Sequence, residues 1–327
     1  MRATTGLMLA GAIVLGATGA LAQSPRGQSP SPAKAAAAPA AVPPAAPAAA
    51  APSPAVPAPA PTPVKSTCAN PDALGVGRVV EIDTTGGPGF GFEHFKQLDF
   101  LRDKEVVLTF DDGPWQSTTP TVLKTLADEC TKAIFFPIGK HATYYPDVLK
   151  AVAAAGHTVG SHTWSHAALT NKKLTEQQRT DEIEKGLSAV KWALGAQPAP
   201  FFRFPALQHP PETVTYLGTR NIAIFSCDID SFDFKTHKPD QVISNVMTKL
   251  DRLGKGIILM HDFQKPTMEA LPTLLRRLKA GGYKVVQMRA KKPAETIASY
   301  DEALLKDVKL PTVSTRPLNS VVQTISE

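Results

Sequence analysis

Cysteine, aromatic residues and long apolar runs are all scarce in this sequence of 327 residues. Beyond residue 23 no segment is apolar for long enough to cross a bilayer, so we expect no membrane span after the N-terminal region. No basic run is interleaved with aromatic residues, which argues against a nucleic-acid-binding protein. The net charge of +6 fits a solvated surface or a protein that meets acidic polymers. Nothing in the sequence indicates an oligomeric state.

The cysteine count is 3, an odd number that limits the disulfide pattern. Cys227 falls in an apolar segment that we expect to be a strand, so its thiol is predicted to be buried and free. Cys68 and Cys130 remain as a predicted disulfide of an exported protein. The spacing of the cysteines does not fit a cysteine-ligated zinc site.

The N-terminal 66 residues are predicted to lie outside the folded domain. Residues 1–22 combine Arg2, a short apolar run and the pattern Ala20-Leu21-Ala22, which together are typical of a secretory signal peptide. Residues 23–66 are mostly Ala and Pro, which cannot bury enough apolar surface to fold, and we interpret them as a disordered linker. The sequence therefore predicts an exported protein, periplasmic or secreted.

Strand-like and helix-like segments alternate from residue 105 onward. Residues 120–128 are predicted to form a helix with Thr119 as its N-cap, and a capping box at Thr175 starts a second helix that ends at Gly195. Such alternation predicts an α/β domain with parallel strands and helical crossovers. About seven units without a glycine-rich dinucleotide fingerprint favour a barrel over a doubly wound sheet. We place this domain at residues 67–313 and a C-terminal tail at residues 314–327.

Residues capable of acid–base or metal chemistry follow five of the predicted strands. In chain order these are Asp111 with Asp112, His162 with His166, Arg203, the acidic residues from Asp228 to Asp233, and His261. Because the active site of a parallel barrel forms where the strands end, this coincidence predicts an enzyme. An ordinary Asp-Gly turn is the alternative interpretation of the first pair taken alone.

His162 and His166 are four residues apart. On a helix or in a tight turn this spacing lets both imidazoles reach one ion, whereas two unrelated loop histidines are the structural alternative. Two histidines and one aspartate, with open positions for water, describe a catalytic zinc site. The same donors suit non-haem iron, although their order is not the one expected of an iron facial triad.

The five segments together resemble the ordered motifs of the polysaccharide deacetylase family, which is carbohydrate esterase family four with a NodB-homology domain. The segments are Thr109–Gly113, His162–His166, Arg203–Pro205, Asp230–Phe234 and Leu259–His261, within residues 105–286. The resemblance implies a distorted (β/α)7-type barrel. It also implies a metal-dependent hydrolase that removes N-acetyl groups from a polysaccharide containing N-acetylglucosamine, such as peptidoglycan, chitin-like chains or exopolysaccharide.

The resemblance also implies a role for each matching residue. The implied metal ligands are Asp112, His162 and His166, with Zn²⁺ or another divalent transition metal as the ion. Asp111 would be the general base for the attacking water. His261 would be the general acid for the leaving amine, Asp233 would keep His261 cationic, and Arg203 would orient the base.

Two positions depart from the family pattern. Ala206 stands where the family usually has Tyr, and its backbone N–H is the implied donor to the oxyanion. Phe234 replaces the usual Trp as an apolar wall, and Leu259 is expected to line the acetyl pocket. Two alternatives stay open. An esterase acting on O-acetylated polysaccharide of the xylan type would use the same machinery, and a non-catalytic glycan-binding cell-wall protein is supported only by these two departures.

Overall fold

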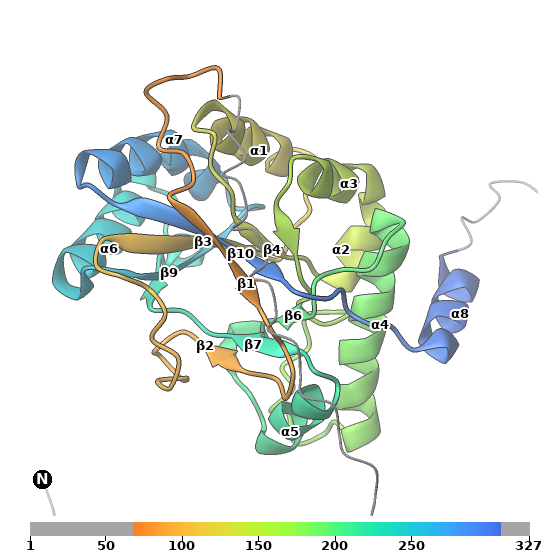
Figure 1. Cartoon of the computed structure of the whole chain (residues 1–327). Helices are drawn as coiled ribbons and strands as arrows, with labels where there is room; N and C mark the ends of the chain where they lie inside the picture. The colour runs from red at the N-terminus through yellow and green to blue at the C-terminus, as the bar shows by residue number, and fades with distance from the viewer. Residues whose placement is uncertain (1–67, 309–327) are drawn as a thin grey trace, which may run out of the picture. The chain divides into compact units, whose positions relative to one another are not determined.

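The computed structural model describes residues 68–308, in which helices surround the strands (Figure 1). The predicted signal peptide, linker and C-terminal tail therefore lie outside the described residues. Within them, no helix is both long and apolar enough to cross a membrane.

The strands of the described residues are short, and every ladder between them is parallel. They are β1 (Arg78–Ile82), β2 (Gly89–Phe90), β3 (Glu105–Asp111), β4 (Ile134–Phe136), β5 (Thr158–Val159), β6 (Phe201–Phe202), β7 (Ala223–Phe225), β8 (Ile229–Asp230), β9 (Gly256–His261) and β10 (Lys284–Ala290).

The helices follow the strands in alternation. They are α1 (Thr119–Asp128), α2 (Gly139–Tyr144), α3 (Pro146–Ala154), α4 (Glu176–Leu194), α5 (Pro211–Thr219), α6 (Pro239–Leu253), α7 (Lys265–Ala280) and α8 (Ala298–Asp307), with 3₁₀ turns at Pro205–Leu207 and Asp233–Lys235. The alternation is the one that the sequence predicts, although β1, β2, β8 and α2 were not predicted.

β3 is the central strand, and all seven of its residues are buried. Its apolar and β-branched sequence suits a strand that is covered on both faces. It pairs with β9 from Val106 to Asp111, with β4 from Thr109 to Asp111, and with β10 at its start. The register places Asp111 beside His261 and Phe136, at the ends of three neighbouring strands.

The strands form a ring with one interruption. Ladders connect β8, β9, β3, β4 and β5 in that order, a bridge from Ser161 to Phe202 continues the ring to β6, and β6 pairs with β7. Strand β2 pairs with the other edge of β7. Among residues 68–308 no ladder joins β2 to β8, and we call this interruption the seam. The predicted distorted barrel of parallel strands is therefore confirmed, with its ring of hydrogen bonds open at the seam.

Helix α4 begins as the sequence predicts. The Thr175 side chain accepts from the Gln178 N–H, the Gln178 side chain accepts from the Thr175 N–H, and Gly195 ends the helix in the left-handed conformation. The predicted N-cap of α1 is wrong, because Thr118 takes that position. The Thr119 hydroxyl is used elsewhere: it accepts from the Trp115 N–H and donates to Asp262.

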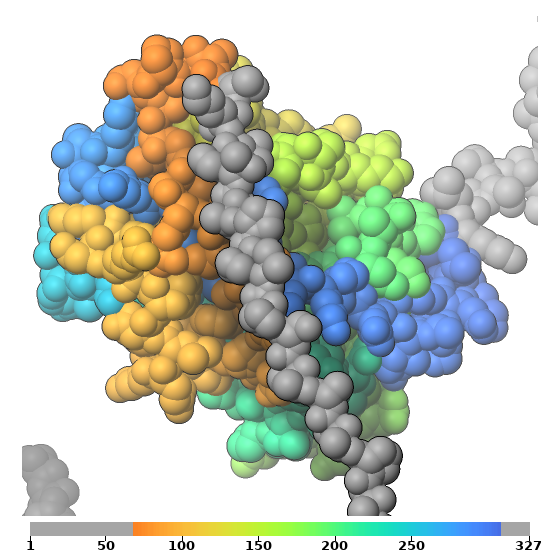
Figure 2. Space-filling model, viewed as in Figure 1, coloured from red at the N-terminus to blue at the C-terminus, as the bar shows by residue number. Residues whose placement is uncertain are grey.

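Two contacts fix the ends of the described chain. Cys68 and Cys130 form a disulfide and Cys227 is buried as a free thiol, as predicted. Helix α8 contacts α4, as the adjoining green and blue surfaces of Figure 2 show, and both Lys185–Asp307 and Lys191–Asp301 pair across that contact.

His157 is a buried histidine at the start of β5, and its Nδ1 accepts a hydrogen bond from the Ala133 N–H. Burial, together with the charge of Lys132, lowers the pKa of His157 to about 3. The folded protein therefore keeps this ring neutral at pH values where the unfolded chain protonates it. The resulting stability is fully present above pH 6.5 and is lost as the pH falls from 6.5 towards 3.

We expect His157→Asn to reduce the acid sensitivity of folding, because the amide oxygen can still accept from Ala133 and does not titrate. Between pH 7 and pH 5 the His157 contribution should cost the wild type about 2 kcal/mol of unfolding free energy. Urea unfolding at the two pH values measures this difference. The exposed residue His237 provides the control His237→Asn, and equal acid sensitivity of all three proteins would contradict the assignment.

Candidate active site

The C-terminal ends of the strands surround a cavity of about 360 Å³. Eight residues that the sequence singles out line it, namely Asp111, Asp112, His162, His166, Ala206, Phe234, Leu259 and His261. Phe204, Leu207 and Asp230 complete the wall. Parallel pairing brings these segments together because every strand presents its C-terminal end at the same side of the ring.

Asp112, His162 and His166 form a candidate metal site. One donor atom of each lies within 4.8 Å of the others, and Asp112 Oδ1 is 3.4 Å from Nε2 of both histidines. Ligands 2.0–2.1 Å from a tetrahedral ion stand about 3.4 Å apart, so these separations fit one ion. Asp112 Oδ1 is also buried without a hydrogen-bond partner among the described residues, as expected of an atom reserved for a metal.

The electrostatics of this site favour neutral imidazoles. His162 Nδ1 lies 2.6 Å from the Arg203 carbonyl, to which it can only donate, so Nε2 is left unprotonated for a metal. Burial lowers the pKa of both His162 and His166, which keeps the rings in the form that binds metal. Burial raises the pKa of Asp112, and the facing imidazoles of His162 and His261 oppose that rise.

A turn, rather than a helix, sets the spacing of the two histidines. Thr163 and His166 have positive φ angles of 64° and 60°. Glu182 of α4 holds the turn, since its carboxylate accepts from the Ser165 N–H at 2.8 Å and from the Ser165 hydroxyl at 2.7 Å. Sequence reasoning missed Glu182, which looks like one more polar residue on a helix.

Arg203 is completely buried, and its guanidinium bonds only to groups of the strands that surround it. Its guanidinium donates to Asp111 Oδ1 and Thr109 Oγ1 on β3, each at 2.7 Å. It also donates to the carbonyls of Phe225 and Ser226 at the end of β7, at 3.3 and 2.9 Å. Asp111 is therefore held by a charge-assisted hydrogen bond in a fixed orientation.

His261 is held by Asp233, which is fully buried. One carboxylate oxygen of Asp233 lies 2.7 Å from His261 Nδ1, and the other accepts from the His261 N–H and the Thr267 hydroxyl. Burial lowers the pKa of His261, but the hydrogen bond and charge of Asp233 outweigh it and raise the pKa to about 9. His261 Nε2 lies 3.8 Å from Asp112 Oδ2, beside the candidate metal ligands.

Asp262 supports the loop after β3, and sequence reasoning missed it. Its carboxylate accepts from the Gly113 N–H at 3.1 Å and from the Thr119 hydroxyl. A Cβ at position 113 would lie 2.2 Å from an Asp262 oxygen, so glycine is required there. Asp112 and Gly113 thus form a turn, and Asp262 fixes this turn through its hydrogen bond with the Gly113 N–H.

Ala206 and Leu207 both have left-handed backbones, with φ of 52° and 58°. Among the described residues the Ala206 N–H has no hydrogen-bond acceptor, which leaves it available to a ligand in the cavity. The Phe234 ring contacts His261 edge-to-face at 5.6 Å and is 49% exposed, whereas Leu259 is buried in the cavity wall.

Two other acidic residues have different surroundings. Asp230 lines the cavity and accepts from the Phe232 N–H, so it lies closer to the site than its predicted structural role suggested. Asp228 accepts from the backbone N–H groups of Phe92 and Ile257, both at 2.6 Å, which is the predicted structural role.

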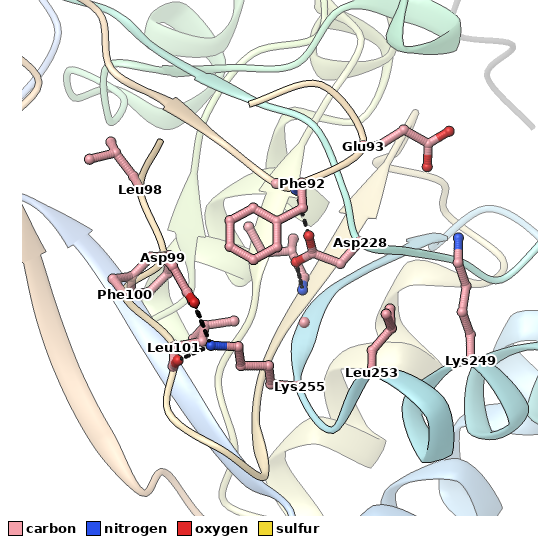
Figure 3. A pocket seen from close by; sticks show the side chains of 13 residues that line it. Phe92, Glu93, Leu98, Asp99, Phe100, Leu101, Asp228, Lys249, Leu253 and Lys255 are labelled. Carbon is pink, nitrogen blue, oxygen red and sulfur yellow. Dashed lines mark hydrogen bonds and ion pairs between the residues drawn. The ribbon is translucent and has the colours of Figure 1, made fainter. Parts of the chain in front are cut away.

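A second cavity, of about 400 Å³, lies at the other end of β9 (Figure 3). Its walls are mainly apolar and include Phe92, Leu98 and Leu253. Lys255 reaches across one side to Asp99 and the Leu101 carbonyl. No histidine lines this second cavity. The residues capable of acid–base and metal chemistry are therefore concentrated in the cavity at the C-terminal ends of the strands.

Comparison with known proteins identifies one family. A sequence model described as polysaccharide deacetylase matches residues 100–222. The chain is 34% identical over 190 residues to the peptidoglycan-N-acetylglucosamine deacetylase PgdA of Listeria monocytogenes, covering 56% of this chain and 38% of that protein. It is 32% identical over 190 residues to a peptidoglycan-N-acetylglucosamine deacetylase of Bacillus cereus, covering 55% of this chain and 67% of that one.

The fold has solved counterparts. A peptidoglycan deacetylase of Bdellovibrio bacteriovorus superposes with a TM-score of 0.60 at 34% identity, covering 66% of this chain and 59% of that chain. The chain spans less than half the length of the Listeria relative.

The donor set predicts that the purified protein binds one divalent transition-metal ion. His166→Ala should weaken Zn²⁺ binding by more than about tenfold, because it removes one of three protein ligands. Titration calorimetry of chelator-treated protein measures the affinity. His237→Ala, at an exposed histidine outside the cavity lining, should bind like the wild type, and unchanged affinity of the His166 variant would exclude this site.

Proposed function

Because this chain belongs to the polysaccharide deacetylase family, we propose that it removes N-acetyl groups from a polysaccharide containing N-acetylglucosamine. The observation that carries the proposal is the convergence in one cavity of an Arg-held carboxylate, an Asp-His-His metal set and an Asp-held histidine. The names of the relatives support peptidoglycan as the substrate. Asp111 is paired with Arg203, whereas Asp112 belongs to the metal set, so the two carboxylates have different surroundings. Together with the raised pKa of His261 they provide a base, a metal ligand and an acid for amide hydrolysis.

We propose Zn²⁺ as the metal, with Asp112, His162 and His166 as its ligands. When bound, the ion would lower the pKa of a water molecule and polarise the acetyl carbonyl. His162 donates a hydrogen bond from Nδ1 to the Arg203 carbonyl, which orients the ring so that Nε2 can bind the ion.

Asp111 acts as the general base in this proposal. Arg203 occupies its Oδ1, and its Oδ2 accepts no hydrogen bond from the described residues, so Oδ2 is the atom left to take a proton from the attacking water. The water oxygen then forms a bond to the acetyl carbonyl carbon. Ala206 lines the same cavity, and among the described residues its N–H has no acceptor, so in this proposal it donates a hydrogen bond to the developing oxyanion.

His261 acts as the general acid. Asp233 holds Nδ1 and keeps the ring protonated at neutral pH, so that Nε2 carries a proton at the side facing the metal ligands. Transfer of this proton to the amide nitrogen accompanies cleavage of the carbon–nitrogen bond. The products are acetate and a glucosamine residue with a free amine.

We further propose an exported protein whose catalytic domain spans residues 67–313, preceded by a signal peptide at residues 1–22 and a linker at residues 23–66. The composition of these segments supports the proposal, as does the disulfide between Cys68 and Cys130, which needs an oxidising compartment. The acetylated polysaccharide of a cell envelope would be met in that compartment.

Asp111→Asn should lower acetate release from acetylated glycan at least about 100-fold, because the amide cannot accept the proton. Its Zn²⁺ affinity should stay close to that of the wild type, since Asp111 is not among the three ligands. Acetate assays on chitooligosaccharide, peptidoglycan and acetylated xylan measure the loss and identify the preferred acyl linkage. Asp240→Asn on the exposed side of α6 is the control, and undiminished activity of Asp111→Asn would refute the mechanism.

A further inference from the structure

A third cavity, of about 470 Å³, lies at the N-terminal ends of β5 and β6. Its lining includes His157 and Ala199, which precede those strands, and the chain at the end of β10 that leads towards α8 (Figure 1). His162 and Arg203 follow the same two strands at their other ends. The cavity, which we call the basic cavity, is therefore at the opposite end of these strands from the catalytic cavity.

Cations gather at the basic cavity without carboxylates. Arg289, Lys291 and Lys292 line it and are exposed, and no Asp or Glu of the described chain is in its lining. The Lys132 ammonium lies beside it, since a Cβ added to Gly156 of the lining would be 3.7 Å from that nitrogen.

Few groups in the described chain neutralise these charges. Among residues 68–308, Arg289, Lys292 and Lys132 form no ion pair. Lys291 pairs with Asp83 at 3.4 Å, but both side chains are more than half exposed, so solvent screens the pair. Burial and the nearby charge of Arg289 lower the pKa of Lys132. An anion in the cavity would relieve this repulsion.

His157 supplies a directed donor to the same cavity. Its side chain is 7% exposed, and its Nδ1 accepts from the Ala133 N–H, so the neutral ring carries its proton on Nε2. Within the described chain this N–H has no acceptor, yet it is not sealed from solvent. A buried side chain that keeps an unpaired donor in a cavity lined by cations is the arrangement expected of an anion site.

A phosphomonoester fits this arrangement better than a carboxylate. It carries a charge of about −1.5 to −2 near neutral pH and three acceptor oxygens that point in different directions, whereas a carboxylate has one charge and two oxygens in a plane. The donors come from three segments, with Lys132 before β4, His157 before β5 and Arg289 at the end of β10. Arginine binds phosphate through two parallel hydrogen bonds, and lysine adds a point charge.

The rest of the lining favours a sugar as the carrier of the phosphate. Ala196, Gln197 and Pro198 are uncharged, and they leave room beside the cations for a neutral polar group. A lipid phosphate would instead be met by exposed apolar side chains that insert into the membrane. None of the large exposed apolar residues of the described chain lines this cavity.

We propose that the basic cavity binds a phosphomonoester group carried by a sugar, as on a phosphorylated glycan of the cell envelope. The envelope as the source rests on the proposed export, whereas the binding itself does not depend on catalysis. The amine-bearing product of the proposed reaction would be repelled by these cations, so the ligand is a different glycan from the product. Bound in this way, the protein would keep the strand ends that carry the catalytic cavity free.

Titration calorimetry of the purified protein with glucose 6-phosphate tests the site. Arg289→Gln should weaken binding about tenfold, because the phosphate loses its bidentate partner, and Arg289→Lys should recover part of the affinity. Arg252→Gln, which removes an exposed arginine of α6 outside the lining, should bind like the wild type. Acetate release by Arg289→Gln should equal that of the wild type, since Arg289 lies outside the catalytic cavity.

Three further ligands identify the chemistry. Glucuronate, which carries a carboxylate, and inorganic phosphate, which lacks the sugar, should each bind more weakly than glucose 6-phosphate. Vesicles of phosphatidic acid and phosphatidylcholine should bind the wild type and Arg289→Gln equally.

The proposal is overturned if glucose 6-phosphate does not bind, or if Arg289→Gln and Arg252→Gln lose affinity equally. Equal affinity for glucuronate would exclude the phosphate, and equal affinity for inorganic phosphate would exclude the sugar. Vesicle binding that depends on Arg289 would replace the glycan by a membrane. If glucose 6-phosphate binds through Arg289 but no glycan releases acetate, the basic cavity stands and the proposed activity fails.

Discussion

The structure depends on the buried pair of Arg203 and Asp111. A guanidinium without solvent contact costs several kcal/mol unless its charge and its donors are satisfied. Here the partners are one carboxylate and one hydroxyl on β3 and two carbonyls at the end of β7. The bonds that compensate the buried charge therefore also orient Asp111. Because Arg203 offers its own carbonyl to His162, the same residue positions a metal ligand.

Three carboxylates, of which Asp233 and Asp262 are buried and Glu182 is partly buried, hold the loops around this pair. Asp233 fixes His261, Asp262 fixes the turn at Gly113, and Glu182 fixes the turn that carries His162 and His166. Each joins segments that are distant in the sequence and each accepts at least two hydrogen bonds. The site thus consists of loops at the strand ends, and in each loop one carboxylate forms the hydrogen bonds that fix its position.

The sequence predicted the residues that face the cavity better than those that support them. Asp111, His162 and His261 stand at the ends of apolar segments, and such patterns are local. Glu182 and Asp262 act through partners far along the chain, which neither periodicity nor spacing reveals. Thr119 illustrates the difference, since its cap propensity pointed to the start of α1 whereas its hydroxyl bonds to Asp262. The two-residue strands β2 and β8 are too short to show a period.

The seam between β2 and β8 means that backbone ladders alone do not connect all the strand ends that carry the site. In a ring closed throughout by backbone ladders, strand number and stagger fix the diameter. In this chain the backbone ladder is open beyond β2, and the Arg203 side chain hydrogen-bonds both to β3 and to the end of β7. Side-chain hydrogen bonds of one buried arginine, and not backbone ladders alone, therefore connect opposite parts of the ring at the strand ends that carry the site.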